Sequence, residues 1–469
     1  MAGPIQRLDS FFQRVRVRHL GLGLLVAWVY CSWFSSAFFD AADVGVASDT
    51  LKASLLFSAL GFVAVMARPK KRAPLPSKVV FASGVVVSAT TFLFLLSSDA
   101  ALLFWASALG GFASAVLWVS WGELYCRMDR ESAESCIPAS LAAFVASSAL
   151  ICLVPDSIAG IASALLPFVS CIMVLLGESP LPNDFEFPVP TKPLARVAPS
   201  LLGLAFCAAA CSMATGFVTA SIAPDELGAF ACGPLAFYVA GGFVAAIAAP
   251  LVISHARKVN FSSLYEWIVP LVVFSLSCRA FGSEAFDLAA FALACIASLS
   301  AEVAFYVVFV DITVRGLCLP SGAFGVFRSV VQLGFLVGGA FGQWAAGSET
   351  SASGACLVLI CACVVVSPLF RHLQERFDRP SPGWGGADES EACGKEEADA
   401  FADISRKYKL SARESEVLGY LGRGRSVPYM RDVMTISKST IETHIKHIYA
   451  KTGVHSKQEL LDLVEEHRL

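Results

Sequence analysis

One helical stretch near the C-terminus, Ser437–Gly453, carries a face of polar side chains. These side chains could form hydrogen bonds to a partner outside the protein. The apolar residues of this stretch recur at i, i+4, i+7 and i+8 and form one helical stripe: Ile441, Ile445, Ile448 and Tyr449. The residues off this stripe are mostly basic or hydroxyl-bearing: Lys438, Ser439, Thr440, Glu442, Thr443, Lys446, His447 and Lys451. Ammonium and hydroxyl groups donate to phosphate oxygens and to base edges. This face is therefore a candidate for contact with double-stranded DNA.

A second polar set lies inside long apolar runs, where an ionisable side chain is costly unless it is paired or faces a cavity. Glu302 and Tyr306 are one turn apart in one run, and Arg328 and Gln332 are one turn apart in the next. At 1.5 Å per residue, Glu302 and Arg328 lie at depths of about 14 Å and about 10 Å, a difference that an arginine can bridge. We expect them to form an ion pair.

This pair suggests a central ligand cavity in the membrane part. The residues expected to line it are charged, aromatic or amide side chains from four apolar runs: Trp118, Trp121, Glu266, Glu302, Tyr306, Arg328 and Gln332. In the alternative interpretation, Glu266 and Arg328 extend to the membrane interface and the tryptophans belong to an aromatic belt. Glu302 would then be buried alone, for a structural reason. Charge reversal at both members of the pair tests which interpretation holds.

Groups that usually mark catalysis or metal binding do not occur in a recognisable pattern. The chain has no phosphate-binding glycine loop and no Ser/His/Asp set outside the apolar runs. Nearly all of its 15 cysteines sit inside apolar runs without the spacing of metal ligands. We therefore expect no enzyme activity, no cofactor, no metal site and no disulfides.

The elements that position the buried charges are predicted to be membrane-spanning helices. The chain is 56% apolar and 16% charged, with a mean hydropathy of +0.65. Its apolar residues come in runs of about 20, the span of a bilayer hydrocarbon core. Arg7, Arg14, Arg16 and Arg18 precede the first run, which is too long for a signal peptide. The twelve expected spans are 20–39, 51–67, 79–97, 101–124, 137–154, 157–176, 199–222, 231–254, 264–281, 286–311, 321–345 and 353–370.

Charges in the loops predict the orientation of these spans. Alternate loops carry the basic residues Arg68, Lys70, Lys71, Arg72, Lys78, Arg127, Arg130, Lys192, Arg196, Arg257, Lys258, Arg315, Arg371 and Arg376. The other loops carry mainly acidic residues, with Lys52 and Arg279 as exceptions. Because basic loops stay in the cytoplasm, we expect a multi-pass protein of the inner (plasma) membrane with both termini cytoplasmic. Residues 1–18 would form a cytoplasmic N-terminal segment.

A proline-rich loop, Gly177–Pro199, divides the membrane domain 19–371 into two halves of six spans, 19–176 and 199–371. Twelve spans in two halves resemble the major facilitator superfamily, a transporter fold. The loop between the second and third spans has a glycine, Gly61, and a basic cluster, Arg68–Arg72, in about the places that the superfamily's motif requires. It lacks the acidic residue of that motif, so transport does not follow from it.

A change of composition then separates the membrane domain from the C-terminal module. Residues 372–402 are rich in Pro, Gly, Asp and Glu, as expected for a flexible acidic linker. In the module 403–469, Ser411 and Glu414 form a capping box that begins a helix ending near Gly422. Pro428 suits the start of a second helix, and Ser456 with Glu459 a capping box for a fourth. Four short helices, the second and third joined by a tight turn, predict a helix-turn-helix.

The segments of this module resemble the LuxR-type (FixJ/NarL-type) DNA-binding domain. The matching segments are Leu410–Leu418, Arg423-Gly424, Ile436-Ser437, Ser439–Ile441, Thr443–Ile445 and Tyr449–Val454. Two departures are Glu442, where many members carry Lys or Arg, and Arg431, which replaces a small alanine. The resemblance implies DNA binding by the third helix and a homodimer formed through the fourth helix: Leu460, Leu461 and Val464. From Asp403 to Leu469, twelve Lys and Arg exceed nine Asp and Glu, a modest excess compatible with phosphate contact.

These patterns together predict an all-α chain: a polytopic membrane helix bundle (about twelve helices, 6+6) with a C-terminal four-helix helix-turn-helix domain. We expect a membrane-embedded one-component transcriptional regulator, in which a small apolar ligand sensed in the lipid bilayer controls DNA binding. RNA polymerase is a further candidate partner. One alternative is a transporter or transceptor with a regulatory DNA-binding appendage, and another is a sensor that sequesters a protein partner at the membrane.

Overall fold

The computed structural model describes most of the membrane part and about half of the C-terminal module. The described residues are 14–35, 37–38, 44–68, 72–128, 130–178, 187, 194–222, 234–255, 262–314, 316–347, 349–378, 401, 403–422, 434, 438–454 and 459–460. The chain divides into two compact units, Met1–Asp378 and Arg379–Leu469, which are described separately below.

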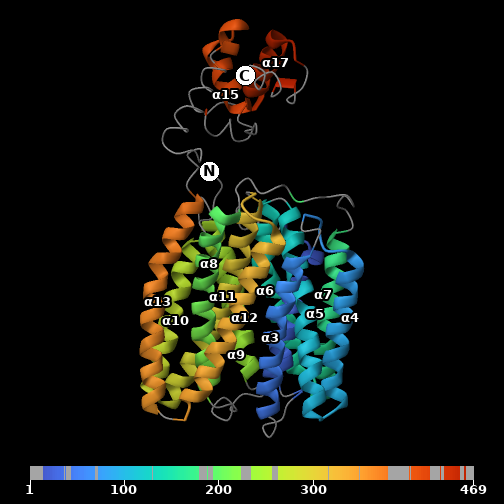
Figure 1. Cartoon of the computed structure of the whole chain (residues 1–469), viewed down its shortest axis with the longest axis vertical. Coiled ribbons are helices and arrows are strands. Elements are labelled where there is room, and N and C mark those ends of the chain that lie inside the picture. The colour runs from blue at the N-terminus through green and yellow to red at the C-terminus, as the bar shows by residue number, and fades with distance from the viewer. Residues whose placement is uncertain are drawn as a thin grey trace. The chain divides into compact units, whose positions relative to one another are not determined.

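The first unit is a bundle of helices, preceded by one short 3-10 turn at Val17–His19. Its helices, among the described residues, are α2 (Gly21–Phe34), α3 (Val44–Ala67), α4 (Ser77–Leu96), α5 (Ala100–Arg127), α6 (Arg130–Leu153), α7 (Asp156–Glu178), α8 (Leu194–Ser221), α9 (Pro234–His255), α10 (Ser262–Phe281), α11 (Glu284–Val314), α12 (Pro320–Ala345) and α13 (Glu349–Asp378). These twelve correspond in order to the twelve predicted spans, and they run side by side (Figure 1).

Length and composition agree with a membrane location for these helices. Eight of them are long and apolar enough to cross a bilayer, and α2, α9, α10 and α13 each contain a shorter apolar segment within the described residues. Large apolar side chains on the outside of the bundle, such as Trp105, Phe206 and Val365, are more than half exposed. A lipid environment accounts for this surface, because an aqueous one would disfavour it. No residue that the structure describes lies in a strand, so the prediction of an all-α polytopic protein is confirmed.

The helices of the first unit pack mainly within two groups, α2–α7 and α8–α13. The two groups meet where α12 packs on α3 and α5, and where α6 packs on α9. Within the second group, α8 and α12 share the most extensive contact. Residues from both groups surround the middle of the bundle, which is where the predicted charged pair lies.

Glycines allow α8 and α12 to approach so closely. Gly334, Gly338 and Gly342 are spaced four residues apart and therefore lie on one face of α12. A Cβ atom at Gly338 would lie 2.0 Å from the carbonyl oxygen of Met213 on α8, so no side chain fits there. Gly334 and Gly342 meet the α8 backbone in the same way. Small residues at this spacing are a common basis of close helix packing in membranes.

The second unit contains α15 (Ala412–Gly422) and α17 (Lys438–Thr452), with residues 403–407 also helical. Its own apolar core joins α15 to α17 and consists of Phe401, Ile404, Val417, Leu418, Leu421, Met434, Ile441, Ile448, Val454 and Leu460. Gly453 follows α17 with φ +74°, a conformation that suits glycine and ends the helix as the sequence predicts. The predicted second helix and most of the fourth lie outside the described residues. A separate core indicates that this unit can fold by itself.

Candidate functional site

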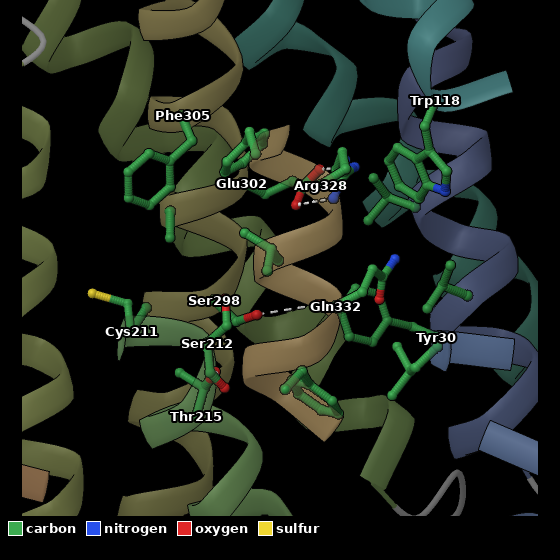
Figure 2. Close-up of a pocket in the computed structure, with 18 of the residues that line it drawn as sticks. Tyr30, Trp118, Cys211, Ser212, Thr215, Ser298, Glu302, Phe305, Arg328 and Gln332 are labelled. Atoms are coloured by element: carbon green, nitrogen blue, oxygen red, sulfur yellow. Dashed lines mark hydrogen bonds and ion pairs between the residues drawn. The ribbon is translucent and has the colours of Figure 1, made fainter. Parts of the chain in front are cut away.

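A cavity of about 100 Å³ lies in the middle of the first unit. Residues of α2, α3, α5, α8, α10, α11 and α12 line it: Val26, Val29, Tyr30, Phe34, Leu51, Leu55, Trp118, Cys211, Ser212, Thr215, Val272, Ala297, Ser298, Ala301, Glu302, Phe305, Phe327, Arg328, Val331, Gln332 and Phe335 (Figure 2). We call this space the central cavity. Its wall is mostly apolar and aromatic, with a few polar groups, a composition typical of small-molecule sites.

The predicted ion pair between Glu302 and Arg328 is confirmed and forms part of this wall. Arg328 Nη1 donates to Glu302 Oε2 at 2.9 Å, and Nη2 donates to Oε1, so the contact is bidentate (Figure 2). The guanidinium carbon also lies 3.6 Å from the centre of the Trp118 ring. The Arg328 side chain is only 3% exposed. The charge is thus held by a carboxylate of α11 and by an aromatic face of α5, two elements from different groups of helices.

Four of the seven residues predicted to line the cavity do so: Trp118, Glu302, Arg328 and Gln332. Tyr306 lies behind the wall, where its hydroxyl donates to the backbone oxygen of Trp118 at 2.8 Å. The expectation for Trp121 was wrong. Its Nε1 donates to Ser170 Oγ at 3.0 Å, so the ring fills space among α2, α5 and α7. Glu266 belongs to α10, but its side chain lies outside the described residues.

Several hydroxyl groups of the cavity were not predicted. Tyr30 Oη and Ser298 Oγ are 3.3 Å apart, within hydrogen-bonding distance, and they join α2 to α11 (Figure 2). Ser212 and Thr215 add two hydroxyls from α8. A signal for Ser298 exists in the sequence, because it precedes Glu302 by one helical turn and so shares its face. No comparable signal marks Tyr30, whose place depends on how α2 meets the other helices.

A second buried charge pair lies where α3 ends. Arg68 Nη2 donates to Glu123 Oε1 on α5, and Glu123 Oε2 accepts from the backbone N–H of Leu75 at 2.7 Å. Glu123 is fully buried. The loop after α3 lacks the acidic residue that the transporter motif requires. The structure shows that α5 supplies a carboxylate to this loop, from a position 55 residues away in the chain.

In the second unit, α17 presents two chemically different faces. Ile441 and Ile448 are buried in the core, whereas Thr440, Glu442, Thr443, Lys446 and His447 are exposed. The predicted apolar stripe is therefore confirmed, and the polar face lies on the exposed side of α17. Lys438 and Ser439 belong to α17, with side chains outside the described residues.

Lys451 and Leu460, which the sequence assigns to external contacts, make contacts inside the unit. Lys451 Nζ donates to Glu414 Oε2 at 2.6 Å and to the backbone oxygen of Lys409 at 3.3 Å, so its ammonium already has partners. Leu460 is fully buried in the core, which leaves its side chain no surface for a second copy. The other two expected dimer residues, Leu461 and Val464, lie outside the described residues.

Glu414 connects the start of α15 to α17. It accepts from the Ser411 N–H at 2.7 Å while its own N–H donates to Ser411 Oγ at 3.3 Å, which confirms the predicted capping box. His447 Nδ1 lies 3.6 Å from Glu414 Oε1. The hydrogen bond from Lys451, together with the one from the Ser411 backbone, lowers the pKa of Glu414 to about 2. The carboxylate is therefore charged at any physiological pH.

Glu414→Gln is expected to destabilise the fragment 402–469 by about 1–2 kcal/mol at pH 7, because a cap and a charged hydrogen bond weaken together. A carboxylate with a depressed pKa stabilises the fold above its ordinary pKa, and this contribution falls as the pH drops from about 4.5 to about 2. Urea unfolding between pH 7 and pH 2.5 should therefore show the two proteins converging at low pH. The control is Glu416→Gln, whose exposed pair with Arg413 should contribute little. A constant difference across this pH range would contradict the assignment.

The second unit is similar to known regulatory proteins. Residues 408–464 match the family described as "Bacterial regulatory proteins, luxR family". Over 60 residues the chain is 40% identical to the Fimbriae Z protein of Salmonella typhimurium, covering 13% of this chain and 29% of that one. Over 45 residues it is 42% identical to the probable transcriptional regulatory protein NarL of Mycobacterium tuberculosis, covering 10% and 21%. The chain thus spans less than a third of the length of these curated relatives.

The first unit is similar in fold to solved transporters. The human organic anion transporter MFSD10 (TETRAN) matches with a TM-score of 0.50 and 12% identity, over 80% of this chain and 99% of that one. A bacterial homologue of the iron transporter ferroportin, in an outward-facing state, matches with a TM-score of 0.51 and 15% identity, over 77% and 100%. At such identities the likeness concerns the fold alone. The chain therefore joins a membrane helix bundle similar in fold to these solved transporters to a C-terminal segment, residues 408–464, that matches the LuxR family of regulatory proteins.

Proposed function

We propose that this protein is a membrane-embedded one-component transcriptional regulator, in which the central cavity binds a signal molecule and the helix-turn-helix domain binds operator DNA. The single observation that carries the proposal is the division of α17, which buries Ile441 and Ile448 and exposes Thr443, Lys446 and His447 within a LuxR-family domain. A recognition helix in the major groove needs such an arrangement. RNA polymerase and a second copy of the chain are the further partners in this proposal.

Control of DNA binding would come from the two groups of helices around the cavity. Arg328 contacts Glu302 on α11 and Trp118 on α5, so both groups meet at one side chain. A ligand that contacts this residue would bind the alternative packings of the bundle with different affinities and would shift their populations. A change of packing could then alter how freely two DNA-binding domains pair.

The orientation belongs to the same proposal. Basic residues such as Lys78 and Arg127 lie at the helix ends predicted to be cytoplasmic, and Asp49, Asp99 and Asp156 lie at the opposite ends. This distribution supports an inner-membrane protein with the DNA-binding domain in the cytoplasm. A reporter fused after Leu469 tests it: activity only outside the cytoplasm would exclude regulation by this route.

Lys446→Ala is expected to weaken binding of fragment 402–469 to the DNA upstream of its own gene by several-fold. Loss of one phosphate contact should also lower the slope of log K against log salt by about 1. Fluorescence anisotropy over a series of salt concentrations measures both. The control is Lys407→Ala, which removes the same charge from an exposed position outside α17. An unchanged salt slope for Lys446→Ala, or an equal loss for the control, would contradict the assigned face.

A transporter or transceptor with a regulatory appendage is the second candidate function. The central cavity favours it, because residues of both groups of helices line it and transporter sites lie near the bilayer midplane between two halves. The two functions differ in what they require. Transport requires accumulation of a ligand in vesicles that contain the protein, whereas regulation requires that the isolated DNA-binding domain recognises its upstream region.

A further inference from the structure

We infer that the central cavity takes a small neutral molecule with a flat apolar body and one hydrogen-bond acceptor, and that Arg328 Nε donates to this acceptor. The inference rests on the proposed function, because it names the chemical class of the ligand in the site that the proposal uses. It adds one hydrogen-bond acceptor to the small apolar ligand that the sequence predicts.

The acceptor on the ligand is inferred from an unused hydrogen-bond donor of Arg328, a residue of the cavity wall. Glu302 engages both terminal nitrogens of Arg328, and Trp118 covers one face of the guanidinium. Nε remains buried without a hydrogen-bond partner among the described residues. A buried donor of this kind costs about 1–3 kcal/mol when it is left unsatisfied. A ligand oxygen satisfies it after a small shift of the guanidinium exposes Nε to the cavity, so an acceptor gains more here than an equivalent apolar group.

Charge balance carries the second step. Among the described residues that line the cavity, Glu302 and Arg328 bear charges of opposite sign, and they already neutralise each other. A ligand with a net charge would disturb this balance in a poorly solvated place, where an unpaired charge is costly. A neutral molecule leaves the pair intact. Its acceptor can still use the positive charge of the guanidinium, because hydrogen bonds with a charged donor are stronger than neutral ones.

The shape of the cavity carries the third step. Six aromatic rings contribute to its lining: Tyr30, Phe34, Trp118, Phe305, Phe327 and Phe335. Aromatic walls favour flat partners that pack against ring faces and edges. The cavity volume of about 100 Å³ is of the same order as an apolar protein cavity of about 150 Å³ that binds benzene. A single ring with one short polar substituent therefore fits both its size and its surface.

Four one-ring probes of similar size test this class on the purified full-length chain in nanodiscs, with empty nanodiscs as the blank. Acetophenone is neutral with an acceptor, ethylbenzene is neutral without one, benzoate is an anion and benzylammonium is a cation. Isothermal titration calorimetry should show that acetophenone binds about tenfold or more tightly than each of the other three. Tighter binding of benzoate, equal binding of ethylbenzene, or binding of none of the probes would overturn the inference.

Arg328→Lys identifies the donor. Lysine keeps the positive charge opposite Glu302 and removes Nε, so the preference for acetophenone over ethylbenzene should fall about tenfold. Arg279→Lys is the matched control, since Arg279 pairs with Asp287 and does not line the cavity. A preference that survives Arg328→Lys would overturn the role of Nε, and the comparison of probes on the wild-type chain holds even if that variant does not fold. These experiments involve no DNA, so their failure is separate from a failure of fragment 402–469 to bind its operator.

Discussion

Reversing the charge of Glu302 or Arg328 alone is expected to destabilise the membrane bundle by roughly 3–5 kcal/mol. Glu302→Arg would place two guanidinium groups, and Arg328→Glu two carboxylates, where a bidentate ion pair now lies. Because the Arg328 side chain is 3% exposed, water cannot screen the repulsion between the two like charges in either single variant. The double variant restores opposite charges and should recover much of this loss. The expected order of stability is wild type, then the double variant, then either single variant.

The double variant should nevertheless remain less stable than the wild type. In the wild type the guanidinium carbon lies 3.6 Å from the centre of the Trp118 ring, and an arginine on α11 would not reproduce that position. The remaining deficit should be about 0.5–2 kcal/mol, the usual range of a cation–π contact. Replacing Trp118 with Leu in the same background would then cost little, although it should be destabilising in the wild type.

Thermal unfolding of the purified chain in detergent measures these differences, with Lys52→Glu as a control. Lys52 lies 3.4 Å from Asp49 in an exposed pair, and reversing its charge should change stability by less than 1 kcal/mol. The interpretation as a buried pair is excluded if the double variant is no closer to the wild type than either single variant. It is equally excluded if the single variants behave like the Lys52 control.

The sequence predicts the parts of this protein that depend on local composition. Spans follow from apolar runs whose length equals the bilayer core, and the structure has a helix for each of them. Glu302 and Arg328 could be paired because few charges lie in these runs and the two have opposite signs at similar depth. The Ser411–Glu414 capping box was equally predictable, since both of its hydrogen bonds lie within four residues. In each case the partner is determined by distance along the chain or along a helix axis.

Features that depend on helix rotation were not predictable. Trp118 and Trp121 are three residues apart on α5, yet one faces the central cavity and the other donates to Ser170 on α7. Serine residues do not show which side of a helix faces the cavity, because a helical serine commonly donates to a backbone oxygen one turn earlier in the same helix. Ser163, for example, donates to the backbone oxygen of Ala159 at 2.8 Å. A sequence does not distinguish such a serine from Ser212, which lines the cavity and has no charged residue of the cavity one turn away.

Tertiary partners also decided the role of single charges in the helix-turn-helix domain. Lys451 lies off the apolar stripe of α17 and was therefore assigned to DNA together with Lys446. Glu414, 37 residues earlier in the chain, instead accepts a hydrogen bond from its ammonium group, although both lysines are exposed. An assignment from helix faces alone cannot separate these two lysines, five residues apart, when one of them pairs with a neighbouring helix.

The sequence partly predicts the packing of α12 against α8. Gly334, Gly338 and Gly342 form a repeat of small residues at intervals of four, a recognised packing signal in membrane helices. The repeat identifies the packing face of α12, but it does not name the helix that packs there. The structure identifies that partner as α8, whose backbone oxygens lie against all three glycines. Alanine at one of these positions should consequently have a larger effect than its single methyl group suggests.

Gly338→Ala is expected to destabilise the membrane bundle by roughly 1–3 kcal/mol or more, the cost of overpacking a tight contact. The added Cβ would lie 2.0 Å from the backbone oxygen of Met213, and a backbone atom cannot move aside as a flexible side chain can. The helices must separate instead, which displaces α12 together with Arg328. Gly338→Ala should therefore weaken the binding of acetophenone to the cavity as well as lower the stability of the bundle.

Gly339→Ala provides the control, since it adds the same methyl group to the neighbouring residue of the same helix. Its Cβ would meet Ala220 Cβ at 3.9 Å, an ordinary contact, so it should leave stability unchanged or slightly raised. Thermal unfolding of both variants in the same detergent separates packing against α8 from the general effect of alanine on helix stability. Equal unfolding temperatures for the two variants would mean that α8 and α12 are not in backbone contact, and the position of Arg328 in the cavity would then lose its structural basis.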